Sequence, residues 1–324
     1  MSEPVVVALD VGGTGMKCAL VRPDGIVHHS ERHPTLAERG PEAVTAHILD
    51  VAAGLAGRAR ADGLEPVAVG VAVPGVVDEE NGVAVWSSNV GFRDVPLKAL
   101  ISQKLGLPAA LGHDVRVGGI AEARLGAGRG QRHVLFVAIG TGIAAAFVLD
   151  GAGYAGAHGA AGEVGHIIVR PGGTPCACGG QGCLEAIASA RAIGRRYAEL
   201  SGISGTTALD VVTRAADGEP LAETVWNEAV DALADGLVTC QGLYDVSVLV
   251  LGGGLAEAGD ALLTPVRNAF EQKITFHRMP EIVRAELGDV AGCLGAALLA
   301  LDHLADAPPA GLRNTKHTPG EGSA

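Results

Sequence analysis

Aromatic side chains, an excess of positive charge and long apolar runs are all scarce in this chain of 324 residues. Phe, Trp and Tyr together make up only 3% of the residues, whereas Gly accounts for 48, which predicts tight turns and close backbone packing in place of an aromatic-rich binding surface. The formal net charge of -12 argues against a nucleic-acid groove or an anionic membrane surface as a partner. Any phosphate site must therefore consist of a few residues and cannot be part of a broad basic surface.

The sequence also predicts neither a leader peptide nor a disulfide framework. No charged segment followed by an apolar run opens the chain, and no apolar stretch of about 18 residues or more resembles a membrane span. We therefore expect a cytoplasmic protein. Three of the six cysteines, Cys18, Cys240 and Cys293, stand singly in apolar segments, as buried thiols do in a reducing compartment.

The remaining three cysteines lie close to one histidine. The set is His166, Cys176, Cys178 and Cys183, and its C-x-C pair lets a Gly-rich turn fold three thiolates around one ion. This spacing predicts a closed tetrahedral zinc site, which is structural because no position stays open for water. The alternative is that the cysteines are small buried hydrophobic residues and His166 an ordinary strand residue. A turn rich in Gly and Pro, however, offers cysteine no core to fill.

Two carboxylates flank the predicted zinc site. Glu163 precedes His166 by three residues, and Glu185 follows Cys183 by two, an arrangement of fixed polar groups that suits a polyhydroxylated ligand. The pattern E-x-G-H followed by C-x-C-G-x-x-G-C-x-E resembles the signature of the ROK family (repressors, open reading frames and sugar kinases). The resemblance implies an α/β, two-lobed actin/hexokinase-like (ribonuclease H-like) ATPase fold, and it implies that Glu163, His166 and Glu185 bind the sugar.

The start of the chain matches the first phosphate loop of that fold. A short apolar strand, residues 5–9, runs into DVGGTGMK, whose glycines turn the chain into a second strand. Glycines let the backbone approach phosphate closely, and an acid at a strand end can hold Mg²⁺ through water. A plain β-turn is the alternative for this segment alone. The resemblance assigns the binding of ATP and Mg²⁺ to Asp10, Gly12, Gly13, Thr14 and Lys17.

Two later turns match the other nucleotide loops. Residues 133–149 repeat the strand, turn and strand of the first loop, and residues 246–251 form a strand that enters three consecutive glycines, the family's adenosine loop. A strand-to-helix turn without a ligand is the alternative for the second of these. The resemblance assigns nucleotide binding to both turns, through Gly140, Thr141, Gly142, Gly252, Gly253 and Gly254.

Further sugar contacts are implied at three positions. Asn89 matches a loop Asn that binds sugar hydroxyls, with turn formation as its alternative role. Asp114 lies where a short strand meets a helix and matches the catalytic base, with helix capping as its alternative role. His113 replaces the Asn that precedes this Asp in the family. We expect its imidazole to contact the sugar and, with a reference pKa of about 6.5, to make sugar affinity pH-dependent.

Apolar residues recur at helical spacing over residues 41–61, 184–200, 208–216, 222–243 and 290–304. The resemblance places the last of these helices against the first lobe. We therefore expect a small N-terminal lobe from residues 1–114 with 290–306, a larger lobe with the zinc motif from residues 115–289, and a disordered tail from residue 307 to 324.

The resemblance spans residues 10 to about 304 and implies an ATP-dependent sugar kinase, with glucose as the expected substrate, Asp114 as the general base and a dimer or tetramer as the assembly. Kinases for N-acetylmannosamine, fructose or allose are alternatives. A transcriptional repressor of the family would carry a helix-turn-helix domain, for which the nine residues before Asp10 leave no room. A non-catalytic sugar sensor is the last alternative, although Asp114 and the phosphate loops argue against it.

Overall fold

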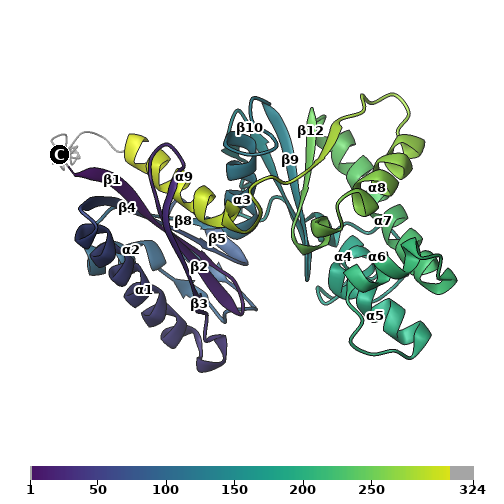
Figure 1. Ribbon diagram of the computed structural model, residues 1–324, viewed down its shortest axis with the longest axis horizontal. Helices are drawn as coiled ribbons and strands as arrows, with labels where there is room; N and C mark the ends of the chain where they lie inside the picture. The colour runs from purple at the N-terminus through teal and green to yellow at the C-terminus, as the bar shows by residue number, and fades with distance from the viewer. Residues whose placement is uncertain (1, 307–324) are drawn as a thin grey trace, which may run out of the picture.

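Two mixed five-stranded sheets dominate the computed structural model, which describes residues 2–306 (Figure 1). The first sheet has the order β3-β2-β1-β4-β8, and the second has β11-β10-β9-β12-β13. In each sheet the central strand pairs antiparallel with the next strand in the chain and parallel with the strand on its other side. The two sheets share one topology, so the internal repeat that the sequence predicts is present in the fold.

The strands and helices have the following bounds. The first sheet consists of β1 (Glu3–Val11), β2 (Gly15–Val21), β3 (Val27–Pro34), β4 (Leu64–Val73) and β8 (Ala109–His113). The second consists of β9 (His133–Ile139), β10 (Ile143–Leu149), β11 (Ala152–Gly153), β12 (Val248–Gly252) and β13 (Glu281–Arg284). A small sheet is made of β5 (Val76–Asp78), β6 (Val83–Trp86) and β7 (Arg93–Val95). The helices are α1 (Pro41–Ala61), α2 (Leu97–Leu105), α3 (Asp114–Arg124), α4 (Leu184–Ala188), α5 (Ala190–Ser201), α6 (Ala208–Ala216), α7 (Pro220–Tyr244), α8 (Asp260–Lys273) and α9 (Ala291–Asp306). Short 3₁₀ turns are η1 (Ala37–Arg39), η2 (Val164–His166), η3 (Gly254–Ala258) and η4 (Gly288–Val290).

Strand β1 is buried on both faces, which explains its unbroken apolar run. Successive strand residues point to opposite faces. Val5, Val7 and Leu9 accordingly join the core under α1, whereas Val6 and Ala8 join the core under α9. The first sheet is therefore a layer between two helical layers, as expected for a sheet with parallel strands.

Helices α3 and α9 connect the two sheets and touch each other through their backbones (Figure 1). A Cβ atom at Gly295 of α9 would lie 1.9 Å from the carbonyl oxygen of Val117 in α3. A Cβ atom at Gly70 of β4 would lie 1.9 Å from the carbonyl oxygen of Ala296. At Gly119 of α3 it would meet the Ala146 side chain of β10 at 2.6 Å. Glycine is therefore required at each layer boundary between the first sheet, α9, α3 and the second sheet.

Residues 288–305, which include most of α9, are long and apolar enough to cross a membrane by length and composition, a feature that the sequence reading missed. In the described structure this helix packs on β1, β4 and β8 with one face and on α3 with another. Contact with two layers accounts for its apolar composition.

Most of the predicted elements are present, and the α/β fold class is confirmed. The helix predicted over residues 184–200 is wrong in one respect, because the chain breaks at Ser189, whose hydroxyl oxygen accepts the Ala192 N–H and caps α5. Sequence periodicity also missed β3, β13, α2 and the small sheet. The assignment of residues 1–114 with 290–306 and of 115–289 to two lobes stays a prediction. The tail predicted from residue 307 lies outside the described residues.

The close crossing of α3 and α9 predicts a large difference between two Gly→Ala substitutions. Gly295→Ala should lower the free energy of unfolding by about 2 kcal/mol or more, because the new methyl group overlaps a backbone oxygen. Gly54→Ala, in the exposed face of α1 with no atom within 4 Å of the new methyl group, should raise it by roughly 0.5–1 kcal/mol. Denaturant unfolding measures both, and equal effects of the two substitutions would show that the crossing is loose.

Candidate functional site

The turn between β1 and β2 is held in shape by a residue far along the chain. The Gly12 N–H donates to the Gly15 carbonyl at 2.9 Å and closes the turn. Thr35, fully buried after β3, donates its hydroxyl to the Gly12 carbonyl at 2.6 Å and its N–H to the Thr14 carbonyl at 3.1 Å. The N–H groups of Gly13 and Thr14 donate to no other described residue. The turn thus presents two unpaired N–H groups, a suitable arrangement for an anion.

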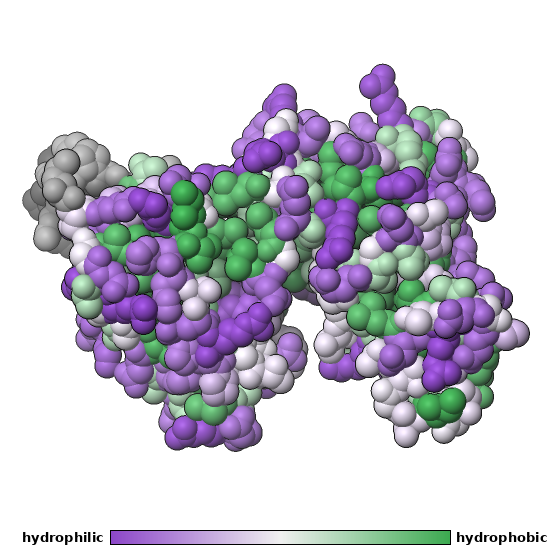
Figure 2. Space-filling model, in the orientation of Figure 1, coloured by the Kyte–Doolittle hydropathy of each residue, from purple (hydrophilic) through white to green (hydrophobic). Residues whose placement is uncertain are grey.

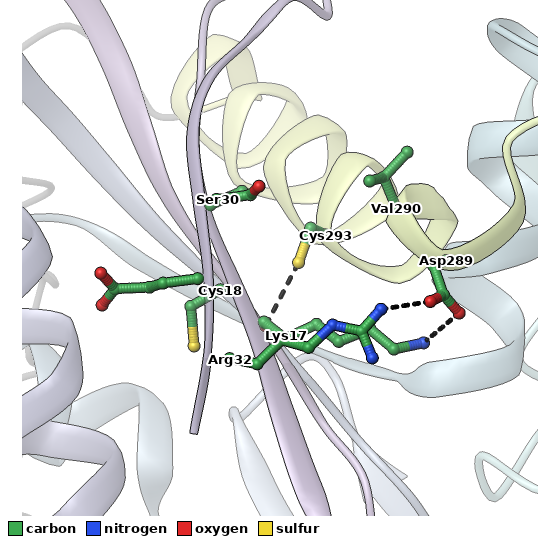
Figure 3. Close-up of a pocket in the computed structure, with 9 residues that line it drawn as sticks. Lys17, Cys18, Ser30, Arg32, Asp289, Val290 and Cys293 are labelled. Atoms are coloured by element: carbon green, nitrogen blue, oxygen red, sulfur yellow. Dashed lines mark hydrogen bonds and ion pairs between the residues drawn. The ribbon is translucent and has the colours of Figure 1, made fainter. Parts of the chain in front are cut away.

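Three charged residues form a row across β1, β2 and β3 next to this turn. Asp10 is opposite Lys17, and Lys17 is opposite Arg32 in the strand register. Figure 3 shows the Lys17 and Arg32 side chains converging on Asp289 of η4, with Lys17 Nζ at 3.1 Å from one Asp289 oxygen. The carboxylate of Asp10 accepts no hydrogen bond from a described residue and faces Gly292 at the start of α9, where a Cβ atom would overlap it. One carboxylate of the row is therefore free for a ligand.

The second hairpin, between β9 and β10, rests on the segment that follows the cysteines. The Gly140 N–H donates to the Gly142 carbonyl at 2.9 Å. Glu185 of α4 accepts the Ile143 N–H at 2.9 Å, and a Cβ atom at Gly142 would lie 2.5 Å from the same carboxylate. One oxygen of Glu185 thus supports this hairpin, and its predicted role in binding the sugar stays a prediction.

The triple-glycine loop lines a cavity of about 580 Å³. Gly253, with a φ of 79°, lies against the backbone of Ile139 at the end of β9, where no side chain would fit. Lys17, Asp289 and Arg284 line the same cavity. The structure therefore brings the loop after β12 together with Lys17 of the charged row. Figure 2 shows a hollow between the two halves of the molecule, which is called the notch below.

Asp114 opens α3, and His113 caps it. The Nδ1 atom of His113 accepts the Arg116 N–H at 3.4 Å, which makes His113 the N-cap. The alternative role of Asp114 as the N-cap is therefore wrong. Asp114 is the first helical residue, and one of its oxygens accepts the Val115 N–H at 2.7 Å. Its carboxylate is left mostly free to act on a ligand.

Burial shifts the ionisation of the residues around Asp114. Burial raises the pKa of Asp114 to about 6, and the charge of Glu163 adds to the rise. Burial likewise raises the pKa of Asp10 to about 6, with a further rise from the charge of Asp114. Burial and the nearby Arg116 guanidinium lower the pKa of His113 to about 4. The expectation that His113 titrates near its reference pKa is therefore wrong, and this imidazole is neutral at physiological pH.

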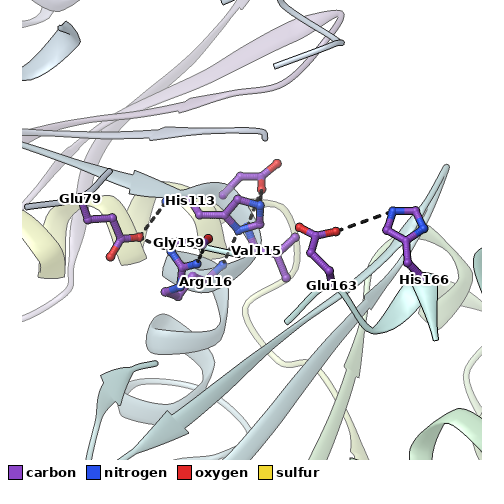
Figure 4. Close-up of polar contacts among 8 residues, drawn as sticks. Glu79, His113, Val115, Arg116, Gly159, Glu163 and His166 are labelled. Atoms are coloured by element: carbon purple, nitrogen blue, oxygen red, sulfur yellow. Dashed lines mark hydrogen bonds and ion pairs between the residues drawn. The ribbon is translucent and has the colours of Figure 1, made fainter. Parts of the chain in front are cut away.

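Glu163 and Asn89 face this region from two other segments. Figure 4 shows the Glu163 side chain pointing toward His166, whose Nε2 lies 3.8 Å from the carboxylate. Asn89 is exposed, and its Cβ would lie 3.2 Å from a Cβ atom at Gly13. Asn89 thus lies against the first hairpin.

The four predicted zinc ligands come together, with all ligand atoms within 4.8 Å of one another. His166 Nδ1 lies 3.7 Å from Cys176 Sγ, and Cys178 Sγ lies 3.6 Å from Cys183 Sγ. Tetrahedral zinc with bonds of about 2.1 Å to nitrogen and 2.3 Å to sulfur requires separations of roughly 3.6–3.8 Å. These side chains fit zinc, and the Nε2 atom of His166 would then face Glu163.

Four residues of this region were missed from the sequence. Thr35 and Asp289 lie in segments without a motif, and Glu79 and Arg116 form an ion pair whose partners are 37 residues apart. Only Arg116 carried a signal, since it follows Asp114 by two residues and is the one charged residue of the stretch 115–121.

Comparison with known proteins gives one family for the whole chain. The model of the ROK family matches residues 6–303. The glucokinase of Thermotoga maritima is 31% identical over 94% of this chain and 99% of its own length. The N-acetylmannosamine kinase of Shigella flexneri is 29% identical, over 91% and 98%.

Solved structures agree with this family. A ROK hexokinase from Thermus thermophilus has a TM-score of 0.83 and 32% identity, covering 94% of this chain and all of its own. A ROK family glucokinase from Streptomyces griseus, in complex with glucose and AMPPNP, has a TM-score of 0.78 and 29% identity over 92% and 99%. A ROK family transcriptional regulator with a TM-score of 0.83 shares only the fold, because its identity is 24% over 91% of this chain and 77% of its own.

The buried hydroxyl of Thr35 gives a test of how the first hairpin is held. Thr35→Val keeps the shape of the side chain but leaves the Gly12 carbonyl without its donor, which should cost roughly 1–3 kcal/mol of unfolding free energy. Thr35→Ser keeps the hydroxyl and should cost less. Chemical denaturation of both variants decides the point, and a Val variant as stable as the Ser variant would contradict the importance of this bond.

Proposed function

The chain belongs to the ROK family, and we propose that it transfers the γ-phosphoryl group of ATP to a hydroxyl of a hexose, most favourably glucose. The observation that carries this proposal is the position of Asp114, a half-buried carboxylate at the start of α3 that lies close enough to Asp10 to raise the pKa of Asp10. The first glycine hairpin presents two unpaired N–H groups beside Asp10, and the loop after β12 lines a cavity together with Lys17. Such an arrangement suits phosphoryl transfer, in which the protein mainly positions the reactants and stabilises charge.

Asp114 would act as the general base. It would accept the proton of the sugar hydroxyl as the hydroxyl oxygen attacks the γ-phosphorus and the bond to ADP breaks. With a pKa of about 6, this carboxylate is ionised at neutral pH. It is also a stronger base than an ordinary Asp, which favours transfer of the proton from the sugar hydroxyl during the attack. Asn89, His113, Glu163, His166 and Glu185 would bind the other sugar hydroxyls.

The nucleotide would lie along the charged row and the glycine loops. The N–H groups of the two hairpins would bind phosphate oxygens, Lys17 would pair with their charge, and the loop after β12 would line adenosine. Asp10 fits Mg²⁺, because its carboxylate accepts no hydrogen bond from residues 2–306 and lies close to Asp114. Bound there through water, the ion would neutralise charge that develops on the transferred phosphoryl group.

His113 would supply a hydrogen-bond donor to the sugar side. Its Nδ1 atom accepts an N–H bond, so its proton lies on Nε2, 3.4 Å from an oxygen of Asp114. A neutral Nε2–H can donate to a hydroxyl or to the base itself. Sugar affinity should therefore not follow a histidine titration.

Zinc would be held by His166 Nδ1 and the three thiolates, as a cross-link of the loop that carries them. The same bond would orient the His166 ring so that Nε2 faces the sugar beside Glu163. The dimer or tetramer expected from the resemblance is part of this proposal as well.

Other members of the family set the alternatives. N-acetylmannosamine kinases share nearly the same identity with this chain, so a kinase for N-acetylmannosamine, fructose or allose is the first alternative. A sugar sensor without catalysis is the second, and it predicts sugar binding but no ADP release. An ATP-coupled assay over a panel of these hexoses separates the three.

Replacing the base tests the mechanism. Asp114→Asn keeps the size of the side chain but cannot take the proton, so kcat should fall by roughly 10² to 10⁴-fold on the best sugar. In the wild type, activity needs the ionised carboxylate, so kcat/KM should fall as the pH drops through about 6, where Asp114 and Asp10 take up protons. More than about a tenth of the wild-type kcat in the Asn variant would remove Asp114 from the chemistry.

Elemental analysis tests the metal. Protein purified without chelators should contain one zinc per chain, and Cys176→Ser should lose it together with part of the sugar affinity, because His166 is no longer oriented. Cys240→Ala, whose thiol is buried in α7 away from the cluster, should keep the zinc. Less than about half an equivalent of zinc in fully active wild-type protein would refute this site.

A further inference from the structure

An ion pair with one buried partner lies directly behind the start of α3. Arg116 is only 2% exposed, and its Nη1 lies 2.5 Å from the carboxylate of the half-buried Glu79, which follows β5 (Figure 4). Its Nη2 donates to the Gly159 carbonyl at 2.8 Å. Removing the Arg116 charge from water costs free energy that offsets much of the attraction within the pair, so the pair calls for an explanation other than stability.

The first role that this pair can have is to fix His113. The same oxygen of Glu79 that pairs with Arg116 accepts the His113 N–H at 3.1 Å. The backbone N–H of Arg116 donates to His113 Nδ1. Glu79 and Arg116 thus hold both the backbone and the ring of His113, and they direct its Nε2–H toward Asp114.

The second role concerns the segment that leads to Glu163. Gly159, which accepts the Arg116 bond, has a φ of 74°, and a Cβ atom there would lie 2.4 Å from the Val77 carbonyl of β5. Gly162 lies as closely against the Ala145 carbonyl of β10, and Glu163 is the next residue. One guanidinium therefore connects the helix of Asp114, the turn of Glu79 and the segment that ends at Glu163.

We propose that Glu79 and Arg116 are the positioning residues of the sugar site, which orient His113 and Asp114 and hold the segment before Glu163 against the small sheet. This inference rests on the proposed function of Asp114. Neither side chain would touch the sugar. Their fork-shaped pairing is specific to Arg, because a Lys ammonium has no planar fork that reaches Glu79 and Gly159 together.

The pair also affects the charge of Asp114. Four groups face this carboxylate: Asp10 from β1, Glu163 from the segment before η2, the neutral His113 ring and the Arg116 guanidinium. Burial raises the pKa of Asp114, whereas the positive charge of Arg116 opposes this rise. The acidic limb is the pH range in which kcat/KM falls because Asp114 takes up a proton. Loss of the guanidinium should therefore move this limb to higher pH, an effect that a purely structural residue would not have.

The experiment uses the zinc-loaded protein with ATP and the best hexose of the panel. Arg116→Met should raise KM for the sugar about tenfold, leave KM for ATP within about twofold, and shift the acidic limb of kcat/KM upward by about 0.5 pH unit or more. Arg116→Met leaves Glu79 unpaired and can unfold the protein. The double variant Glu79→Gln/Arg116→Met is therefore made in parallel, because the removal of both charges is better tolerated than the removal of one. Arg116→Lys keeps the positive charge but not the planar fork, so it should keep the acidic limb of kcat/KM at the wild-type pH and still raise KM for the sugar.

Arg124→Met is the matched control, because Arg124 lies in the same helix and pairs with Asp302 near the surface. Arg124→Met should leave the acidic limb of kcat/KM, KM for the sugar and KM for ATP unchanged. If the double variant keeps the wild-type limb and sugar KM while the wild type is active, the inference is wrong and the proposed function stands.

Hydrogen exchange gives a readout that does not need catalysis. The amides of residues 154–163 should exchange faster in the double variant than in Arg124→Met, whether or not any hexose is phosphorylated. A wild-type protein that phosphorylates no hexose would refute the proposed function. Equal exchange of residues 154–163 in Glu79→Gln/Arg116→Met and in Arg124→Met would refute the positioning role.

Discussion

The contact between α3 and α9 is the constraint on which the rest of the structure depends. A methyl group at Gly295 would overlap the backbone of α3, and one at Gly70 would overlap the backbone of α9. Protein interiors are packed too densely to absorb such overlaps without moving whole elements. Because the helices meet at backbone distance, the first residues of both reach the same point. Asp114 at the start of α3 and Gly292 at the start of α9 each lie beside Asp10.

This convergence has an electrostatic consequence. Burial raises the pKa of Asp10 and of Asp114 to about 6; the charge of Asp114 adds to the rise at Asp10, and the charge of Glu163 adds to the rise at Asp114. A cation in the notch would relieve this repulsion. The carboxylates are therefore arranged for a charged ligand, and the closest fixed cation of the row, Lys17, is already paired with Asp289 in the described structure.

The sequence was sufficient for the parts of the fold that repeat or that carry ligand chemistry. Both hairpins, the zinc-ligand cluster and the helix over residues 41–61 follow from periodicity, glycine spacing and ligand type. The supports of these parts could not be predicted, because they depend on contacts between distant segments. Thr35 lies 23 residues from Gly12, and Glu185 lies 42 residues from Ile143. Strand β3 was missed because polar residues occupy both of its faces: His28, Ser30 and Arg32 on the exposed face, and His29, Glu31 and His33 on the half-buried face.

The histidine at position 113 keeps the hydrogen-bonding pattern of the asparagine that the family resemblance leads one to expect. An Asn side chain at an N-cap accepts a backbone N–H through its oxygen and offers its NH₂ group to a neighbour. His113 accepts through Nδ1 and offers Nε2–H, and burial keeps it neutral so that this pattern holds across physiological pH. The ring is longer than the amide, and its donor lies 3.4 Å from an oxygen of Asp114. The Glu79–Arg116 pair fixes that longer side chain from behind, because Glu79 accepts the His113 N–H and Arg116 donates its own N–H to the ring.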